Sequence, residues 1–489
     1  MLVVAMLAAG YCLFLPRTLF DEPFSATVWS RDGRLMSAKV ASDGQWRFFP
    51  TDSVPEKFRV AITTYEDKRF YRHFGVDPLA LGRAVRQNLA AGRITSGAST
   101  LTMQTIRLSR GGKPRTFREK FVEMVLATRL ELRCSKDEIL ALYASHAPFG
   151  GNVVGLESAA WYYFGRSAAQ LSWAECVMLA VLPNSPSLIH IRRNRERLRE
   201  KRDGLLDRIW HDGRIDSLTC ALAKQEHLPD APEPMPMEAM YLLGKMREGS
   251  LRSTLDYDLQ SRVNDLARRY NKRYRGNKIN NMAIVVMDVE SGDILGLASF
   301  PGYSADSLGD AVSDPDSPMI QRALYAYPVG SIFKLVTAAC AFDQGVGYNF
   351  TWDCDGAISV GTQRFRCHEL QGHGVQHMAD AMRSSCNPYF IALGQALSGS
   401  DLLQTAKSLG FGTEIMLTSN MIASGGTLPT LQQLKLPAEQ ANFSFGQGVL
   451  TASPLQIARM TCAIAGDGTL PAVRLVRGVT DDGRTVLRE

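Results

Sequence analysis

The chain has 489 residues, which predicts about two or three domains, and it carries a net charge of +6. Hydrophobic residues make up 45% of it and charged residues 21%, as in an ordinary globular protein. The modest charge suits an anionic substrate or an acidic membrane surface, and we expect no nucleic-acid partner. The nine cysteines include no Cys-x-x-Cys pair, which argues against a zinc site, and we expect no metal-ligating residues.

The N-terminal stretch MLVVAMLAAGYCLFLP is apolar, and no charged residue precedes Arg17. Residues 2–15 supply about 14 apolar positions, fewer than the roughly 20 that a helix needs to cross a bilayer. They lack the basic start that a signal peptide requires. We therefore interpret residues 1–16 as part of a membrane anchor whose beginning is missing. The alternative is a buried, apolar N-terminal helix.

From residue 55 to 228 the pattern is mostly helical. KFVEMVLATRLEL and SKDEILALYASH repeat apolar residues at three- and four-residue spacing, and Ser135 with Glu138 predicts a capping box. LSWAECVMLAVL repeats the pattern and ends before the prolines of PNSPS. Residues 192–202 hold seven basic side chains with two glutamates between them. This favours a solvated helix face over a stripe that faces a membrane.

A change of composition follows the helical region. LPDAPEPMPMEAM is rich in proline and acidic residues, so residues 229–255 are predicted to form a linker. MAIVVMDVESGDILGLASF predicts two strands joined by a turn at Ser291-Gly292, and helices are expected to follow. The sequence thus predicts a multidomain protein, with a helical domain over residues 45–228 and an α/β domain over residues 256–489.

The helical region holds a first group of residues suited to chemistry. In YEDKRFYRHFGVD, Glu66 and Asp67 lie among aromatic residues, where a partly desolvated carboxylate suits general acid–base work. SGASTLTMQTIRL predicts a polar loop that enters a helix and that either holds an anion or simply caps the helix. Lys120 and Glu123 share a helix face, and a carboxylate beside cations can stay ionised. The candidate binding residues are His73, Ser99, Thr100, Gln104, Arg107, Arg115 and Lys120.

These segments resemble family 51 glycosyltransferases, the peptidoglycan polymerases. The family motif Glu-Asp-x-x-Phe-x-x-His-x-Gly matches residues 66–75 in full. The motif Gly-x-Ser-Thr-x-x-x-Gln matches residues 97–104 in full. HAPFGGNVVGLESAAWYYFG also fits, and its APFGG resembles the penicillin-binding protein 1C branch of the family. The resemblance covers residues 50–210.

Two further motifs match in part. Arg-Lys-x-x-Glu is matched at Lys120 and Glu123, but Glu119 stands where the arginine is expected. Lys-x-x-Ile-Leu-x-x-Tyr-x-Asn begins at Lys136 and ends with Ser145 in place of the asparagine. Neither departure falls on an expected proton carrier.

The resemblance implies a lysozyme-like helical fold that acts on lipid II and the growing glycan strand. Glu66 would be the general base that deprotonates the acceptor sugar hydroxyl. Glu123 and the cations Arg107, Arg115 and Lys120 would assist departure of the lipid diphosphate. A divalent cation such as Mg²⁺ would be able to help there, although the sequence offers no ligand set for it. We expect no other cofactor.

A second group centres on PVGSIFKL, in which Ser331 and Lys334 lie one helical turn apart. An unprotonated lysine there could accept the proton of the serine hydroxyl. Alone, Ser-x-x-Lys is usually a coincidence, but SSCNPYF adds Ser385 and Asn387. These residues resemble the Ser-x-Asn motif of penicillin-binding transpeptidases. Other parts of that domain are resembled by three further segments: the predicted strand pair, RSTLDYDLQ and FGQGVLTASPLQIARM. The resemblance implies that Ser331 is acylated, that Ser385 relays a proton and that Asn387 orients the substrate.

That family also has a Lys-Thr-Gly or Lys-Ser-Gly strand motif, and neither tripeptide follows Asn387. We therefore interpret residues 256–489 as an incomplete, serine β-lactamase-like transpeptidase domain. RFRCHELQGHG resembles a segment of the class A enzymes. Cys354 and Cys367 bracket a short polar stretch that could be a hairpin, and an exported location would permit a disulfide between them.

The two resemblances combine in the bifunctional class A penicillin-binding proteins. They imply a bacterial inner-membrane protein with one N-terminal anchor and periplasmic catalytic domains, whose ligands include peptidoglycan stem peptides and β-lactams. One alternative is a glycan-cleaving relative of lysozyme, which the basic residues placed for a diphosphate argue against. The other is a non-catalytic, membrane-anchored scaffold, which the intact Glu66 and Glu123 argue against.

Overall fold

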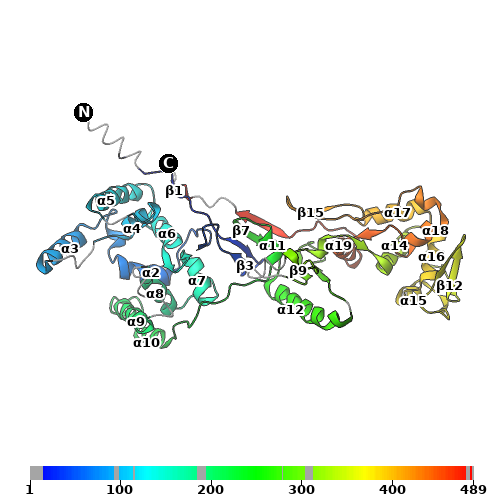
Figure 1. Ribbon diagram of the computed structural model, residues 1–489, viewed down its shortest axis with the longest axis horizontal. Helices are drawn as coiled ribbons and strands as arrows, with labels where there is room; N and C mark the ends of the chain where they lie inside the picture. Colours follow the sequence, from blue (N-terminus) through cyan, green and yellow to red (C-terminus); the bar gives the residue numbers. More distant parts are fainter. Residues whose placement is uncertain are drawn as a thin grey trace, which may run out of the picture. The chain divides into compact units, whose positions relative to one another are not determined.

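The computed structural model describes residues 11, 15–92, 98–113, 116–183, 194–277, 279–302, 312–480 and 485–486. The chain forms two compact units. The first comprises Met1–Trp29, Gly33–Arg252 and Gly478–Glu489, and the second comprises Ser30–Asp32 and Ser253–Arg477. In Figure 1 the helices of the first unit run from blue to green and those of the second from green to red. The predicted order, a helical unit followed by a mixed α/β unit, is confirmed.

The first unit is mainly helical. Its described helices are α2 (Glu56–Glu66), α3 (Pro78–Ala91), α4 (Leu101–Ser109), α5 (Phe117–Glu131), α6 (Lys136–His146), α7 (Leu156–Phe164), α8 (Trp173–Val181), α9 (Arg195–His211), α10 (Ser217–Gln225) and α11 (Met240–Gly244), with the 3-10 turns η1 (Phe70–Arg72) and η2 (Ala168–Gln170). Its described strands are β1 (Thr18–Phe20), β2 (Ala26–Trp29), β3 (Leu35–Lys39), β4 (Trp46–Arg47), β5 (Pro148–Gly150), β6 (Val153–Val154), β7 (Gly249–Ser253) and β19 (Thr485–Val486).

Helix α8 lies in the core of the first unit. A capping box between Ser172 and Glu175 starts it, because each side chain accepts a hydrogen bond from the backbone N–H of the other residue. Every residue from Cys176 to Val181 is buried, and the helix packs against α2 and α9. A helix that is apolar on all sides has to be enclosed, and each fully buried valine or leucine stabilises the fold by about 1.5–3 kcal/mol. The helix predicted for LSWAECVMLAVL is confirmed.

The helices predicted on either side of Ser135 are confirmed as α5 and α6. The capping box at the start of α6 is also present: Ser135 Oγ accepts from the backbone N–H of Glu138, whose carboxylate accepts from the backbone N–H of Ser135. This reciprocal pair satisfies two donors that the first turn of a helix leaves without partners. The local sequence therefore determines where α6 begins.

The basic helix α9 buries apolar residues that include Leu198 and Leu205. Arg199 and Glu196 form an ion pair on its exposed side, as expected for a solvated face. Arg202 is the exception, because it is only 1% exposed and donates hydrogen bonds to backbone carbonyl groups at the end of α10. Burying its charge requires such partners. One of the predicted surface cations is therefore part of the core.

Part of the predicted linker is regular structure. Helix α11 and the whole of strand β7 fall within residues 229–255. Strand β7 pairs in parallel with β2, with Val28 opposite Leu251, and β2 pairs antiparallel with β3, with Thr27 opposite Ala38. A proline-rich segment thus leads directly into a sheet. Local composition could not predict this because the partner strand lies more than two hundred residues earlier in the sequence.

The second unit mixes helices and short strands. Its described helices are α12 (Tyr257–Tyr274), α14 (Lys334–Asp343), α15 (Met378–Arg383), α16 (Asn387–Ala396), α17 (Gly399–Ser408), α18 (Pro437–Ser444) and α19 (Pro454–Ala465), with the 3-10 turns η3 (Arg275–Asn277), η4 (Arg322–Leu324), η5 (Gly330–Phe333) and η6 (Gln433–Lys435). Its described strands are β8 (Met282–Met287), β9 (Ile294–Phe300), β10 (Tyr327–Pro328), β11 (Trp352–Cys354), β12 (Ala357–Val360), β13 (Gln363–Arg366), β14 (Gly374–Gln376), β15 (Ile415–Thr418), β16 (Met421–Ala423) and β17 (Thr451–Ala452). Strand β18 (Val476–Thr480) spans the boundary with the first unit.

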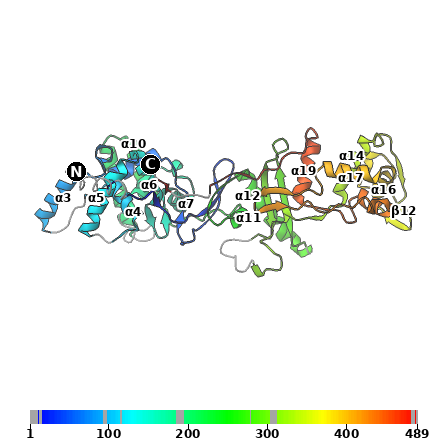
Figure 2. The ribbon, with the colours of Figure 1, turned by 90° about the horizontal axis from the view of Figure 1, so that it is seen from above.

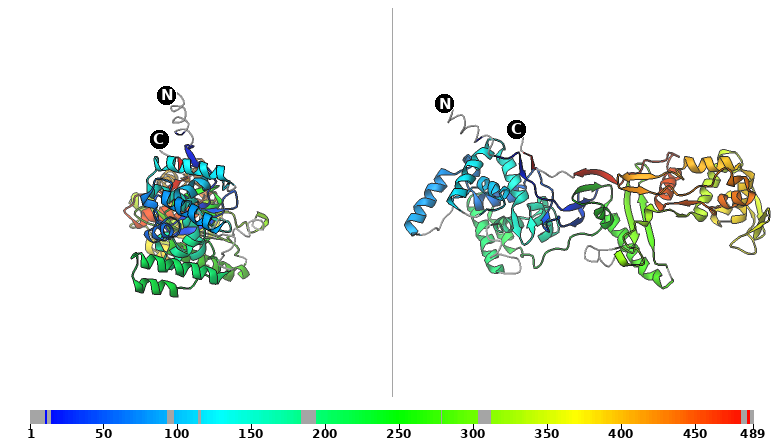
Figure 3. Two further views of the ribbon diagram at one scale, coloured as in Figure 1. Left: turned by 90° about the vertical axis from the view of Figure 1, so that its left-hand side faces the viewer. Right: turned by 45° about the horizontal axis from the view of Figure 1, so that its top comes forward.

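The predicted strand pair is confirmed as the antiparallel hairpin of β8 and β9. At its turn, Asp288 accepts hydrogen bonds from the backbone N–H and the hydroxyl of Ser291. Gly292 follows with a φ of 72°, and a Cβ there would lie 2.2 Å from the carbonyl oxygen of Ala472, so only glycine fits. Helix α12 packs against β9, and the two are labelled next to each other in Figure 1. Figures 2 and 3 show the same green part of the chain from other sides.

The predicted membrane anchor, residues 1–16, lies almost entirely outside the described residues. Within the described part of the chain, no helix combines the length and the apolar character needed to span a bilayer.

Candidate active sites

Glu66 is the last residue of α2, and a residue of α4 holds its side chain. The Nε2 atom of Gln104 donates a 2.9 Å hydrogen bond to Glu66 Oε2. Burial, followed by the charge of Glu66, raises the pKa of Tyr143 on α6. The structure therefore brings together two residues of the predicted site, Glu66 and Gln104, and adds a buried tyrosine from a third helix.

Lys201 is a neighbour of Glu66 that the sequence analysis did not single out. It lies on α9, where burial and the nearby Arg197 lower its pKa and the charge of Glu66 opposes that shift. In the sequence it is one of seven cations within eleven residues, so nothing distinguishes it from its solvated neighbours. Only the packing of α9 against α2 places this cation near the carboxylate.

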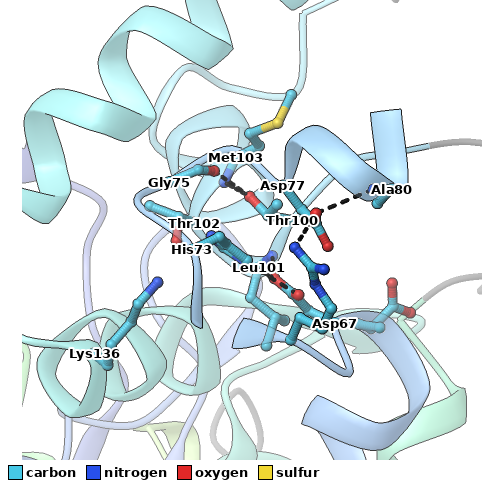
Figure 4. Close-up of polar contacts among 12 residues, drawn as sticks. Asp67, His73, Gly75, Asp77, Ala80, Thr100, Leu101, Thr102, Met103 and Lys136 are labelled. Carbon is cyan, nitrogen blue, oxygen red and sulfur yellow. Dashed lines mark hydrogen bonds and ion pairs between the residues drawn. The ribbon is translucent and has the colours of Figure 1, made fainter. Parts of the chain in front are cut away.

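His73 and Asp67 form a buried pair beside this site (Figure 4). Nε2 of His73 lies 2.9 Å from Asp67 Oδ2, which also accepts a hydrogen bond from the backbone N–H of Leu101 at 3.0 Å. The His73 side chain is only 1% exposed. The prediction that His73 binds substrate stays a prediction. In the structure His73 pairs with Asp67, and Asp67 connects the loop after α2 to the start of α4.

Thr100 has a similar structural role. It is the N-cap of α4: its Oγ1 accepts from the backbone N–H of Met103 and donates to the carbonyl oxygen of Gly75 at 2.6 Å (Figure 4). Its side chain is buried, whereas Ser99 is exposed. Of the two readings of this loop, helix capping therefore accounts for Thr100, and Ser99 is free to meet a ligand. That Thr100 also binds substrate stays a prediction.

We expect Asp67→Ala to lower the free energy of unfolding of the first unit by about 1–3 kcal/mol, because His73 and the N–H of Leu101 would lose a buried acceptor. Denaturant unfolding of the full chain would measure this. Asp230→Ala is the matched control: Asp230 is 97% exposed and its pair with Arg195 is worth at most about 1 kcal/mol. Equal losses in the two variants would contradict the account.

The predicted diphosphate-binding cations lie on two helices that pack together. Arg107 is in the last turn of α4 and Lys120 in the first turns of α5, both partly exposed, and α4 packs against α5. Glu123 is buried on the same helix as Lys120. Arg115 lies outside the described residues. Two separate segments thus provide cations and a carboxylate on adjacent helices.

Glu119 and Ser145, the two residues that differ from the family motifs, have different surroundings in the structure. Glu119, which replaces the expected arginine, pairs with Arg110 at 2.5 Å, and this hydrogen bond lowers the pKa of its carboxyl group. The pair joins the end of α4 to the first turn of α5. Ser145, which replaces the expected asparagine, is buried on α6. Glu119 therefore takes a structural role in this chain.

The second candidate site lies at the junction of η5 and α14. Ser331 is exposed on the 3-10 turn η5, and Lys334 begins α14 with its side chain buried. Lys334 Nζ lies 3.1 Å from Ser331 Oγ. The turn is held tightly, since Gly330 donates a hydrogen bond to the carbonyl of Gly446 and a Cβ on Gly446 would clash with Gly330. The predicted stacking of hydroxyl over amine is confirmed.

Four oxygen atoms surround the amine of Lys334. Besides Ser331 Oγ they are the carbonyl oxygen of Ser385 at 2.7 Å, Ser385 Oγ at 2.9 Å and Asn387 Oδ1 at 2.7 Å. An ammonium donates three hydrogen bonds, so these oxygens stabilise the charged form of the amine. Burial acts in the opposite direction and lowers the pKa of Lys334 to about 8, against smaller opposing effects of Cys386 and Cys367. Lys334 therefore gives up its proton more readily than an exposed lysine, and it is mostly neutral only above pH 8.

Ser385 reaches Lys334 from an unusual backbone conformation. Its φ is 52°, in the left-handed region that residues other than glycine rarely adopt. The turn it forms places both of its oxygens within hydrogen-bond distance of Lys334 Nζ and starts α16 two residues later. The structure thus unites all four residues predicted for this site.

The rate at which Ser331 is acylated should rise with pH. If Lys334 is the base, it is protonated and inactive below its pKa of about 8 and neutral above it. The second-order rate constant for a labelled penicillin should therefore fall about tenfold per pH unit below pH 8 and level off above it. Labelling reactions of the full chain, quenched at successive times and repeated at pH values below and above 8, would test the prediction. A rate independent of pH would contradict a basic role for Lys334.

The predicted disulfide between Cys354 and Cys367 is wrong. Both are free thiols in the structure, and both are buried. The physical reason is that they do not form an isolated pair: the thiol of Cys386 and the imidazole of His373 lie in the same cluster. The sequence interval suggested a local hairpin bridge, but a third cysteine arrives from the start of α16.

Comparisons with known proteins agree with both halves of this description. A family model described as Transglycosylase matches residues 32–209, and one described as Penicillin binding protein transpeptidase domain matches residues 282–488. Penicillin-binding protein 1C of Escherichia coli (strain K12) is 32% identical over 401 residues, which are 78% of this chain and 50% of that protein. Penicillin-binding protein 1A of Neisseria cinerea is 34% identical over 231 residues, 47% of this chain and 29% of that protein.

The chain spans half or less of the length of these relatives. Among solved structures, penicillin-binding protein A from M. tuberculosis, as a ceftriaxone acyl-enzyme complex, is 23% identical with a TM-score of 0.42, over 49% of this chain and 56% of that one. That likeness is too weak to carry structural detail across. The two family models match, in chain order, the helical unit and the unit that holds Ser331. This chain therefore belongs to the class A penicillin-binding proteins.

Proposed function

We propose that the chain is a peptidoglycan glycosyltransferase that polymerises lipid II into glycan strands. The observation that carries the proposal is the setting of Glu66, which is held by Gln104 in a helical unit that matches the transglycosylase family model. A cation, Lys201, lies close enough to affect the same carboxylate electrostatically. A carboxylate that is oriented by one polar side chain and remains half-buried is suited to accept a proton from a sugar hydroxyl.

In this proposal the oxygen of the acceptor hydroxyl attacks the anomeric carbon of the donor, while Glu66 removes the proton of that hydroxyl. The new glycosidic bond forms while the bond from that carbon to the lipid diphosphate breaks, and the diphosphate leaves with the bonding electrons. Arg107 and Lys120 on the neighbouring helices α4 and α5 supply positive charge for this leaving group. Glu123, buried on α5, would assist departure of the diphosphate together with these cations.

A divalent cation such as Mg²⁺ is part of the proposal only as a partner of the diphosphate. Among the residues that the structure describes, the first unit has no group of three or more side chains that could together ligate a metal ion. Mg²⁺ is commonly bound by one or two carboxylates and substrate phosphates, with several waters retained. Here it would neutralise charge on the leaving group, with the diphosphate as its principal ligand.

We further propose that the second unit cross-links stem peptides through an acyl-Ser331 intermediate, and that β-lactams acylate the same hydroxyl. The 3.1 Å contact between Lys334 Nζ and Ser331 Oγ supports this, because burial lowers the pKa of Lys334 to about 8 and a neutral amine there can take the Ser331 proton. Ser385 would relay that proton to the leaving group, and Asn387 would orient the peptide. Both activities would take place on the periplasmic face of the bacterial inner membrane, with the chain attached by an N-terminal anchor.

Two substrates given in parallel would test the polymerase proposal. Purified full chain should convert lipid II into long glycan strands and should leave preformed glycan strands unchanged. Shortening of preformed strands without use of lipid II would instead identify a lytic enzyme. If both substrates are untouched while penicillin still labels Ser331, the first unit would be a scaffold and the polymerase proposal would fail.

A further inference from the structure

Four potential metal ligands converge from the end of β11, the loop between β13 and β14, and the start of α16. Cys354 Sγ, Cys367 Sγ, Cys386 Sγ and a ring nitrogen of His373 all lie within 4.8 Å of one another. The three cysteines are at most 3% exposed, and His373 is half-buried. No other group of this kind occurs among the residues that the structure describes.

The backbone around the cluster is tightly built. Cys354 ends strand β11 opposite Gly374 of β14, and the backbone N–H of Cys367 donates to the carbonyl of Gly356 at 2.9 Å. Gly372 has a φ of 80°, and a Cβ there would lie 2.0 Å from the carbonyl oxygen of Cys354. These close approaches hold the loop that carries Cys367 and His373 against the end of β11. The ligands are therefore positioned by the fold itself.

The composition and size of the cluster fit one ion better than they fit a disulfide. A disulfide would use two of the three sulfur atoms and leave the third thiol and the imidazole without a role. A tetrahedral zinc ion uses all four, and Zn–S and Zn–N bonds of about 2.3 and 2.0 Å place sulfur and nitrogen about 3.5 Å apart. Cys367 Sγ and His373 Nδ1 are already 3.4 Å apart. Sulfur atoms on zinc lie about 3.8 Å apart, so the cluster would contract by no more than about 1 Å.

We propose that Cys354, Cys367, His373 and Cys386 bind a structural zinc ion. Three thiolates and one neutral imidazole form a closed Cys₃His set, which leaves no open position for a substrate. The ion joins the end of β11, the loop between β13 and β14, and the start of α16. The free energy of binding a structural metal adds to the stability of the folded state, so the ion would stabilise a region whose other elements are short strands.

The zinc site would also fix the positions of Ser385 and Asn387, the neighbours of Cys386 in the sequence. Cys386 lies between Ser385 and Asn387, whose oxygens contact Lys334 Nζ. Gln376 strengthens the connection, since it accepts from the hydroxyl of Ser384 and donates to the carbonyl of His373. Zinc would thus fix the turn that presents Ser385 and Asn387 to Lys334. Any effect on acylation rests on the proposed function of this unit, whereas zinc binding itself does not.

The metal content of the full chain, purified without chelators under non-oxidising conditions, tests the proposal. Elemental mass spectrometry should find about one zinc ion per chain. Replacing a residue that only hydrogen-bonds to a metal ligand already lowers metal affinity roughly 10-fold or more. Cys354→Ser and His373→Gln remove a ligand itself, so each should lower zinc affinity by more than that. Cys462→Ser, which alters a buried cysteine outside the cluster, is the matched control and should keep its zinc.

A second measurement covers the case in which the cysteine variant does not fold. Hydrogen exchange of the unaltered chain should be slower across residues 367–386 with zinc than after removal of zinc by a chelator. The proposal is overturned if the reduced chain neither contains nor takes up zinc, or if both variants bind zinc as the control does. A disulfide between any two of the three cysteines in the exported protein would also overturn it. Loss of penicillin labelling with zinc still bound would count against the proposed function alone.

Discussion

Replacement of Glu66 by glutamine should reduce lipid II polymerisation by about 10²–10⁴-fold, the contribution typical of a positioned general base. Glutamine has nearly the same shape and can keep a hydrogen bond to Gln104, but it cannot accept the proton of the acceptor hydroxyl. The initial rate of glycan formation from labelled lipid II measures this loss. The midpoint of thermal unfolding should stay nearly unchanged, because Glu66 is only half-buried and the hydrogen bond is preserved.

The second unit provides an internal control for this variant. Because Ser331 and its partners all belong to that unit, Glu66→Gln should leave covalent labelling of Ser331 by penicillin at the level of the unaltered chain. Polymerisation at an unaltered rate would show that Glu66 is not the base. Loss of both activities together would indicate misfolding, and the thermal midpoint would reveal it.

Replacement of Ser331 by alanine should remove covalent penicillin labelling completely, because Ser331 is the exposed serine whose hydroxyl contacts Lys334 Nζ among the residues that the structure describes. Ser385 Oγ also lies 2.9 Å from Lys334 Nζ, but Ser385 is less exposed than Ser331 and sits in a strained turn. Denaturing gel electrophoresis after incubation with a fluorescent penicillin detects the adduct. Polymerisation of lipid II should be unaffected by the change.

A matched serine variant makes this result interpretable. Ser408 is exposed at the end of α17, and Ser408→Ala should label like the unaltered chain. Labelling that persists in Ser331→Ala at the original level would mean that another residue is acylated. In that case the four oxygens around Lys334 would need a different explanation.

Much of the fold could be predicted because its signals are local. The capping boxes at Ser135 and Ser172 lie within four residues, and the helical periodicity of α5, α6 and α8 lies within three or four turns. The Ser331–Lys334 contact is of the same kind, since three residues of helical backbone bring the two side chains together. The turn at Gly292 was recognisable because the backbone there allows only glycine.

The features that were missed depend on tertiary packing, which local sequence patterns do not reveal. His73 looked like a ligand-binding residue, yet the fold buries it against Asp67. Lys201 is one of many basic residues until packing brings it near Glu66. The four residues of the Cys₃His cluster are spaced by 13, 6 and 13 positions, from 354 to 367, 373 and 386, which matches no short metal motif. The position of each of these side chains depends on tertiary structure, which the local sequence does not reveal.

The length distribution of the glycan that the purified chain makes from labelled lipid II is the most direct test of the central claim. The account predicts strands that grow longer with time, in a reaction that requires Glu66 and continues when penicillin occupies Ser331. Lipid II that stays unchanged under conditions in which the chain is folded and Ser331 is labelled would contradict it.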